Sequence, residues 1–426
     1  MASFFIPLTG LQADSTALNT IANDLSNMNT TAFKAQATNF SNLFYQQVGE
    51  TGSGDLIQVG AGTQVASNST DFSQGSYNTS GMGSSDMAID GNGFFIVKDS
   101  DGAIAYTRDG SFSQDTSGNL VTANGSSLMG YAAVNGVVNT SAPLTPIGVP
   151  SMGQVQLPTA TTSFSMTANL DSEATSAFPA TVSVYDSLGA SHNVTITYTE
   201  TAPGAWTYSA ALPAADFANG VSTPITGTLN FDPDGNLISV AQGAGAPQNV
   251  GAAPGDISSI PLNFNNALAD GANNLNLSWN LLGSSGTPTI SQVDEASAVS
   301  GTTANGNAAG TCTGFTIGSD GTVTAQYTSG TEVVGQIALA NMTNLQGLNL
   351  EADGEYQATL ASGTASVGAA GSGGLGGIQD SALEDSNVNI SSEFSDLIIA
   401  QRGFEADSKA VTTFDTVAQD TINMIH

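Results

Sequence analysis

The sequence predicts a mainly β protein, in which two antiparallel β domains, barrel-like or sandwich-like, are carried on a paired N- and C-terminal α-helical coiled coil. Three observations predict this class: apolar residues spaced by seven at both ends of the chain, short apolar runs separated by turn dipeptides between the ends, and 49 glycines among 426 residues. A hydrophobic content of 40% provides enough apolar surface for more than one core, which argues against a disordered chain.

The N-terminal helix is predicted by its apolar spacing. Leu11, Leu18 and Leu25 step by seven, and Ile21 and Met28 form a second row three residues later. This is the a/d spacing of a helix that packs against a second helix.

A second helix is predicted at the C-terminus by the same spacing. Its main row and the neighbouring row consist of Ile390, Leu397, Phe404, Val411, Ala418 and Ile425, with Phe394 and Ile422 beside them. One such stripe alone could pack onto its own globular domain. Two matched stripes favour pairing of the two chain ends with each other.

Short β runs occupy the middle of the chain. The clearest strand-turn-strand patterns lie at 94–121, 181–198 and 315–327, and dipeptides such as Asp101-Gly102 mark their turns. Because these runs follow one another closely, we expect the sheets to be mainly antiparallel.

The pattern divides the chain into four expected parts. A run rich in Gly at 361–377 is typical of a flexible linker. The parts are a terminal helical domain (1–33 with 385–426), a connecting segment (34–75 with 361–384), an inner β domain (76–145 with 291–360) and an outer β domain (146–290).

The charge of the chain excludes several classes of partner. There are 36 acidic residues and 5 basic residues, which give a net charge of -31. Nucleic acids and anionic membranes bind clustered Lys and Arg, so neither is an expected partner. No apolar run reaches the length of a membrane span, and the first residues lack the basic and apolar regions of a cleaved signal peptide.

The residues needed for catalysis are not grouped in the sequence. The two histidines, His192 and His426, are too few for a zinc cluster of the usual kind, and Cys312 is a single cysteine. Residues 371–376 match a Gly-rich nucleotide motif but have no Lys or Arg nearby. The sequence therefore predicts no enzyme, no catalytic residues, no cofactor and no metal site.

Both chain ends carry a motif that resembles the bacterial flagellar rod and hook axial protein family. The matching positions are Asn23, Leu25, Asn27, Thr30, Phe33 and Lys34 near the start, and Ser386, Asn387, Val388, Gln401 and Arg402 near the end. Two further blocks, 90–95 and 106–112, resemble the same family. One departure is Gly403, which weakens a helix interior by about 1 kcal/mol.

The insertion in the middle of the chain resembles the outer domain of the hook branch of this family. Residues 168–171 and 185–189, together with Trp206, carry this likeness. The resemblance implies a structural subunit that self-assembles into a curved, flexible tube and acts as a universal joint between rod and filament. The alternatives are a distal rod subunit and an extracellular adhesin-like β protein.

The resemblance also implies partners and a location. The terminal rows of both helices would form the polymer interface with other copies of the chain. Further partners would be the distal rod protein, the hook cap, the hook-filament junction proteins and the flagellar export apparatus. The protein would be extracellular and exported by the flagellar type III pathway without a cleaved signal peptide.

Phe40 and Phe44 resemble an element that the export gate recognises. The alternative is that these two aromatic residues share one face of a helix and pack into the core.

Overall fold

The computed structural model describes residues 5–50, 56–80, 82–134, 136–283 and 285–424. The chain forms two compact units. Unit 1 comprises Met1–Ser151, Gly314–Ala325 and Glu332–His426, and unit 2 comprises Met152–Thr313 and Gln326–Thr331. The four-part division expected from the sequence stays a prediction.

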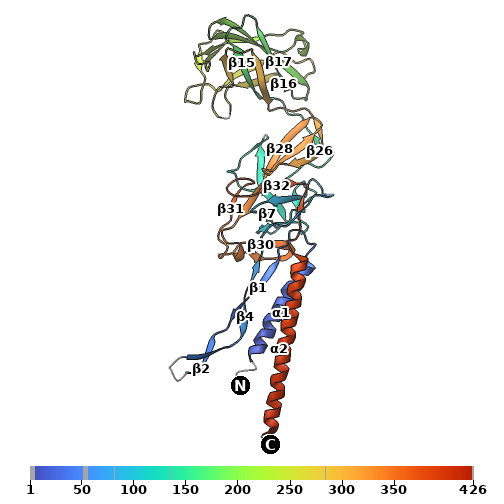
Figure 1. Ribbon diagram of the computed structural model, residues 1–426. Helices are drawn as coiled ribbons and strands as arrows, with labels where there is room; N and C mark the ends of the chain where they lie inside the picture. Colours follow the sequence, from blue (N-terminus) through green and yellow to red (C-terminus); the bar gives the residue numbers. More distant parts are fainter. Residues whose placement is uncertain (1–4, 51–55, 81, 135, 284, 425–426) are drawn as a thin grey trace. The chain divides into compact units, whose positions relative to one another are not determined.

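Two long helices of unit 1, α1 (Phe5–Ser26) and α2 (Ile390–Met424), pack against each other (Figure 1). Ala17, Ile21 and Ala400 are buried at this contact. The predicted class, a mainly β protein whose terminal helices pair, is therefore confirmed. The described helices include no segment with the length and apolarity of a membrane span.

A two-stranded ribbon follows α1. Strands β1 (Gln36–Asn42) and β4 (Thr63–Thr70) pair antiparallel, and so do β2 (Tyr45–Glu50) and β3 (Leu56–Gly60). The ribbon begins beside α1, which packs on β1 and β4.

The position of the two aromatic residues corrects one alternative. Phe40 lies in β1 and Phe44 lies between β1 and β2, and both side chains are exposed. They do not share a helix face or pack into a core, because their segment adopts extended conformation at the surface.

The main sheet of unit 1 is built around β7 (Phe94–Lys98), which pairs with β8 (Ile104–Thr107), β11 (Ser127–Val134) and β28 (Gly330–Asn341). Phe95 and Val97 point into one core, whereas Phe94 and Ile96 point into another. The continuous apolar run of β7 follows from burial on both faces of the sheet.

Shorter elements complete unit 1. They are β5 (Tyr77–Asn78), β6 (Met87–Asp90), β9 (Ser113–Gln114), β10 (Leu120–Val121), β12 (Val137–Val138), β13 (Thr145–Pro146), β29 (Asn349–Leu350), β30 (Glu355–Gln357), β31 (Ser366–Ala369), β32 (Gly377–Asp380), β33 (Leu383–Glu384), η2 (Leu345–Gly347) and η3 (Ala352–Gly354). Three of the boundaries between the units fall inside strands, namely β26 (Gly310–Ile317), β27 (Thr322–Tyr327) and β28, and the fourth lies between Ser151 and Met152.

The prediction of a flexible linker at 361–377 is wrong. Within it, β31 pairs with β28, and β32, which starts at Gly377, pairs with β6. Its glycines serve the turn between β31 and β32: Gly371, Gly373 and Gly374 have positive φ, and a Cβ at Gly376 would overlap the carbonyl of Asp90. Composition alone could not separate a mobile linker from a tight turn that needs these glycines.

Unit 2 contains two sheets with a core between them. The first sheet has the order β22-β23-β15-β24, with β25 also paired to β15, and the second has the order β16-β17-β18-β19-β20-β21. The strands of these sheets are β15 (Ser163–Asp171), β16 (Phe178–Tyr185), β17 (Ser191–Ala202), β18 (Ala205–Ala211), β19 (Ile225–Phe231), β20 (Leu237–Gln242), β21 (Gln248–Asn249), β22 (Ser259–Phe264), β23 (Leu275–Asn280), β24 (Ile290–Val293) and β25 (Ala298–Ala304). Unit 2 also contains the short helix η1 (Ala214–Asp216) and β14 (Val155–Gln156), which pairs with β26.

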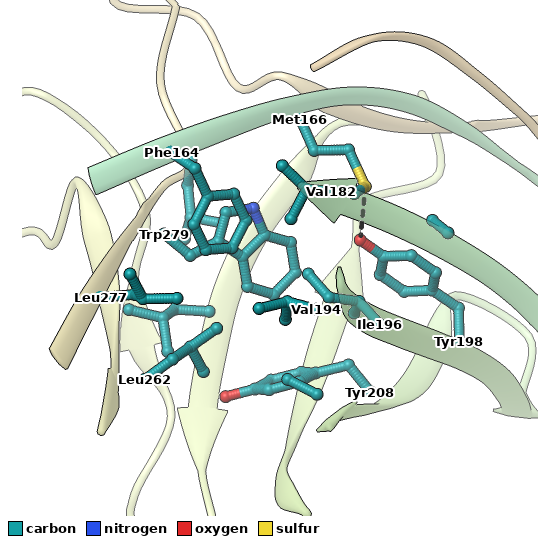
Figure 2. Packing of buried hydrophobic residues seen from close by; sticks show 14 of the residues in the cluster. Phe164, Met166, Val182, Val194, Ile196, Tyr198, Tyr208, Leu262, Leu277 and Trp279 are labelled. Carbon is teal, nitrogen blue, oxygen red and sulfur yellow. Dashed lines mark hydrogen bonds between the residues drawn. The ribbon is translucent and has the colours of Figure 1, made fainter. Parts of the chain in front are cut away.

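The core of unit 2 follows from strict alternation along its strands. In β17, for example, Val194, Ile196 and Tyr198 are buried while their neighbours are more exposed. Figure 2 shows Phe164 beside Trp279, whose rings stack with centroids 6.2 Å apart. Alternation of this kind is expected for a two-sheet, sandwich-like domain.

Candidate functional site at the paired chain ends

A buried ionic group joins the two ends of the chain. Lys34 Nζ lies 2.6 Å from Glu384 Oε1, and Arg108 Nη1 lies 3.4 Å from Glu384 Oε2. The three side chains are between 0 and 6% exposed. Lys34 follows α1, Arg108 follows β8 and Glu384 ends β33, so one carboxylate connects three distant segments.

Backbone groups satisfy the rest of this ionic group. Lys34 Nζ donates to the carbonyl of Ser73 at 2.8 Å, and the amide of Gly75 donates to Glu384 Oε1 at 2.9 Å. Arg108 Nη2 donates to the carbonyl of Gly91 at 2.7 Å. Burial lowers the pKa of Lys34 and of Arg108, and the Glu384 carboxylate opposes this effect. A buried ion pair is tolerated only when its remaining polar atoms are bonded in this way.

Asn387 ties the two terminal motifs together through the backbone. Its Oδ1 accepts from the amide of Ala35 at 2.8 Å, and its Nδ2 donates to the carbonyl of Asp71 at 2.8 Å. The Ala32 amide also donates to the carbonyl of Glu384 at 2.8 Å. Two motifs far apart in the sequence therefore form one structural junction.

The remaining motif residues divide into two groups. Asn23, Asn27, Thr30, Phe33 and Lys34 line one hollow of about 610 Å³. The others are spread along the chain: Leu25 packs at the helix contact, Ser386 Oγ accepts from the Val388 amide at 3.3 Å, and Gln401 and the Arg402–Glu405 pair are exposed on α2.

Sequence reasoning missed two buried carboxylates next to the terminal motifs. Besides Glu384, Asp24 is fully buried, and its Oδ2 accepts from the Gln36 amide at 2.9 Å. The sequence did contain a signal for Glu384. Lys34 is one of only five basic residues and lies inside a motif. A lysine that is buried needs a carboxylate partner nearby.

The contact between α1 and α2 is antiparallel and very close. A Cβ at Gly403 would lie 2.6 Å from Asp14 Oδ2, and a Cβ at Gly10 would overlap the carboxylate of Asp407. Gly403 was expected only to weaken its helix, but the structure uses it to admit a side chain of α1. Burial and the nearby Asp407 raise the pKa of Asp14.

Many apolar residues of α2 are not covered by the part of the chain that the structure describes. Of the predicted rows, Leu397 packs against α1 and Val411 is half-buried, whereas Phe404 and Ala418 are exposed. Ile425 lies outside the described residues. The exposed large apolar residues of α2 are Ile390, Phe394, Ile398, Ile399, Phe404, Val417, Ile422 and Met424.

The rows of α1 are covered more fully. Ile21 is buried, and Leu18 and Leu25 are partly buried against α2. Leu11 is half-buried, and Met28 follows the end of α1 and is exposed. Near its start α1 also exposes Phe5, Ile6 and Leu8, so both helices carry uncovered apolar side chains and α2 carries more of them.

Three regions of the chain match known protein families. Residues 88–169 match the flagellar hook protein FlgE/F/G D1 domain, and residues 155–307 match the flagellar basal body protein FlaE D2 domain. Residues 379–424 match the C-terminal region of the flagellar basal body rod FlgEFG proteins.

Full-length relatives are also similar to this chain. The flagellar hook protein FlgE of Salmonella typhimurium is 32% identical over 440 residues, covering 99% of this chain and 100% of the relative. FlgE of Rhizobium meliloti is 33% identical over 433 residues, covering 98% and 97%, and FlgE of Borreliella burgdorferi is 30% identical over 463 residues, covering 100% and 99%. The crystal structure of Helicobacter pylori FlgE2 aligns at 13% identity with a TM-score of 0.47, covering 72% of this chain and 99% of that chain.

Proposed function

The chain belongs to the flagellar hook protein FlgE family, and from this we propose that it self-assembles into a curved, flexible tube that transmits torque from the rod to the filament as a universal joint. As a member of this family it is a structural subunit of the flagellar hook. The proposed polymer interface consists of the terminal helices.

The exposed apolar surface of α2 supports this proposal. Ile398 and Ile399 are 57% and 68% exposed, and residues 415–424 at the end of α2 are exposed on all sides. Burial of such surface contributes roughly 25 cal/mol per Å², and a large exposed apolar patch is typical of an interaction site. Neighbouring copies of the chain would provide this burial.

Partners, location and export follow as parts of the same proposal. The distal rod protein, the hook cap and the hook-filament junction proteins would contact the two ends of the polymer. The subunit would leave the cell through the flagellar type III apparatus without a cleaved signal peptide. The exposure of Phe40 and Phe44 would allow the export gate to bind them. The protein would have no enzymatic activity, because its role is mechanical.

The two alternative functions are less well supported. The match of residues 155–307 to a D2 domain, and relatives that are hook proteins over nearly their whole length, favour a hook subunit over a distal rod subunit. The C-terminal match at residues 379–424 is to a flagellar family, which disfavours an adhesin-like protein.

The double substitution Ile398→Asp with Ile399→Asp tests the polymer interface. We expect hooks to be lost, because two carboxylates would enter a surface that must become dry, at a cost of several kcal/mol. The β domains should keep the circular dichroism and thermal unfolding of the wild type. Electron microscopy of cells reports hook assembly.

The matched control is Ser392→Asp with Ser395→Asp, which adds the same charge at exposed polar positions of α2. This variant should still form hooks. If hooks of ordinary length form with the isoleucine pair replaced, the exposed apolar surface of α2 is not the polymer interface.

A further inference from the structure

One histidine and three aspartates gather in unit 2 and take no part in the contacts described so far. His192 Nε2 lies 3.1 Å from Asp186 Oδ2 and 3.7 Å from Asp270 Oδ2. Its Nδ1 lies 3.0 Å from Asp216 Oδ2. The four residues come from the turn before β17, from β17 itself, from η1 and from the loop between β22 and β23.

The backbone holds two of these carboxylates so that one oxygen of each faces the histidine. Asp186 Oδ1 accepts from the amides of Leu188 and Ala190 at 2.8 and 2.9 Å. Asp270 Oδ1 accepts from the amide of Ala272 at 3.0 Å. The second oxygen of each carboxylate is then directed to Nε2, so the site is organised by the loops that form it.

The loops themselves are bonded to one another. The Ala269 amide donates to the carbonyl of Asp216 at 2.9 Å, and the Asn273 amide donates to Ser187 Oγ at 3.1 Å. The Asp186 side chain is fully buried and that of His192 is 8% exposed, whereas the side chain of Asp270 is 31% exposed. The site is therefore preformed and open to solvent on the Asp270 side.

The histidine cannot satisfy these carboxylates as a neutral ring. Neutral imidazole has one N–H, and if Nδ1 donates to Asp216, the lone pair of Nε2 faces two carboxylate oxygens. A proton on Nε2 could bond Asp186, but the 3.7 Å separation from Asp270 is too long for a hydrogen bond. A cation among the three atoms would interact favourably with all of them.

We propose that Asp186 Oδ2, His192 Nε2 and Asp270 Oδ2 bind a divalent cation of the zinc class, with Asp216 orienting the histidine. In a tetrahedral zinc site with bonds of about 2.0 to 2.2 Å, ligand atoms lie about 3.3 to 3.6 Å apart. The separations of 3.1 and 3.7 Å lie on either side of this range. The three atoms all lie within 4.8 Å of one another. Calcium fits less well, because it takes six to eight oxygen ligands.

The remaining features of the site agree with this assignment. A carboxylate on the second nitrogen of a metal-bound histidine is the usual device that fixes the ring and its tautomer. Water from the exposed Asp270 side would supply the fourth ligand. The sequence predicted no metal site because it offers so few histidines, but here two carboxylates from loops far apart in the chain complete the set around one histidine.

Titration of the metal-stripped full chain with Zn²⁺ by calorimetry tests the site, with the absorption spectrum of the Co²⁺ form as a second readout. We expect one equivalent to bind and Co²⁺ to show tetrahedral bands. Asp270→Asn, at the most exposed ligand, should lower the affinity at least tenfold. Asp216→Asn should lower it about 10- to 100-fold, as second-layer changes at zinc sites do.

Two controls separate this site from general cation binding by an acidic chain. Asp294→Asn removes an exposed carboxylate of unit 2, and His426→Gln removes the second histidine, and neither should change the affinity. Absence of saturable binding by the wild type, or equal affinity in Asp270→Asn, would overturn the proposal. In that case His192 is held as an imidazolium by Asp186 and Asp216.

Discussion

At the scale of single residues, Glu384 stabilises the buried junction between the two ends of the chain. It pairs with both Lys34 and Arg108, and it also accepts a hydrogen bond from the Gly75 amide. Arg108 further lies 5.5 Å from the centroid of the Phe94 ring, in the position of a cation–π contact. Loss of the carboxylate would leave two buried cations with much weaker partners.

Glu384→Gln should therefore destabilise unit 1 by about 3 to 5 kcal/mol, the usual cost of removing one partner from a buried ion pair. Chemical denaturation of the full chain measures this change. Glu405→Gln, which removes the exposed partner of Arg402, is the control and should change the stability by less than about 1 kcal/mol. Equal effects of the two substitutions would show that the buried pairing contributes little.

Gly403 gives a second prediction at this scale. In an exposed helix interior, Gly→Ala stabilises by about 1 kcal/mol. Here we expect Gly403→Ala to destabilise the helix contact, because the new Cβ would lie 2.6 Å from the Asp14 carboxylate. Hydrogen exchange of the α1 amides should become faster. Slower exchange would mean that Asp14 moves aside without cost.

At the scale of elements, the α1–α2 contact collects carboxyl groups whose pKa values are raised. Burial and Asp407 raise the pKa of Asp14, and burial raises the pKa of Asp24 despite a hydrogen bond from the Gln36 amide. Burial, with Asp24 and Asp396, also raises the pKa of Glu393. The paired state thus binds protons more tightly than the separated helices do.

This arrangement predicts that mild acid strengthens the helix pair. Between the ordinary values, 3.8 for Asp and 4.5 for Glu, and the raised native values, the paired state holds more protons. The stabilisation is fully present below the ordinary pKa values and is lost as the pH rises through the native ones. Hydrogen exchange of α1, corrected for the intrinsic pH dependence of exchange, measures this trend.

Asp14→Asn provides the control for this pH dependence. It should stabilise the contact at neutral pH and reduce the dependence on pH. If the corrected protection of α1 is the same across this pH interval, these carboxyl groups do not control the pairing.

The sequence predicted an element well where all its apolar residues pack against one surface, and poorly where they pack against several. Alternation along β16 and β17 identified both strands, because their apolar residues face a single core. The seven-residue row of α2 mixed residues with different neighbours, since Leu397 packs on α1 while Phe404 is exposed. Periodicity marks an apolar face but does not say which partner covers it.

The sequence motifs of the candidate site could be recognised, but the contacts between them could not be predicted. The motifs around Lys34 and Asn387 were visible in the sequence, whereas their junction through Glu384 depends on segments separated by most of the chain. The proposed metal site around His192 was missed for the same reason, because its carboxylates come from separate loops. A site whose residues are distant in the sequence and meet only in the folded chain produces no local sequence motif.

At the scale of the whole molecule, the charge of the chain controls how easily copies can approach. Thirty-six acidic and five basic residues give -31 per subunit, and like charges on neighbouring subunits repel in a polymer. The apolar surface of α2 must overcome this repulsion in the proposed assembly. Salt reduces the repulsion, because the screening length falls from about 30 Å at 0.01 M to about 8 Å at 0.15 M.

We therefore expect isolated hooks to become more stable as the salt concentration rises from about 0.01 to 0.15 M, the range over which screening shortens most in absolute terms. The midpoint of thermal disassembly, followed by light scattering in NaCl, measures this effect.

Divalent cations should act at lower concentration than NaCl, either by general screening or by binding at the proposed site, and Asp270→Asn distinguishes these two origins. If general screening dominates, hooks of this variant keep the wild-type response to Zn²⁺, whereas a weaker response to Zn²⁺ shows that binding at the His192 site contributes. Equal midpoints at low and moderate ionic strength would show that repulsion between subunits does not limit the polymer, and that the acidic surface is neutralised within the assembly.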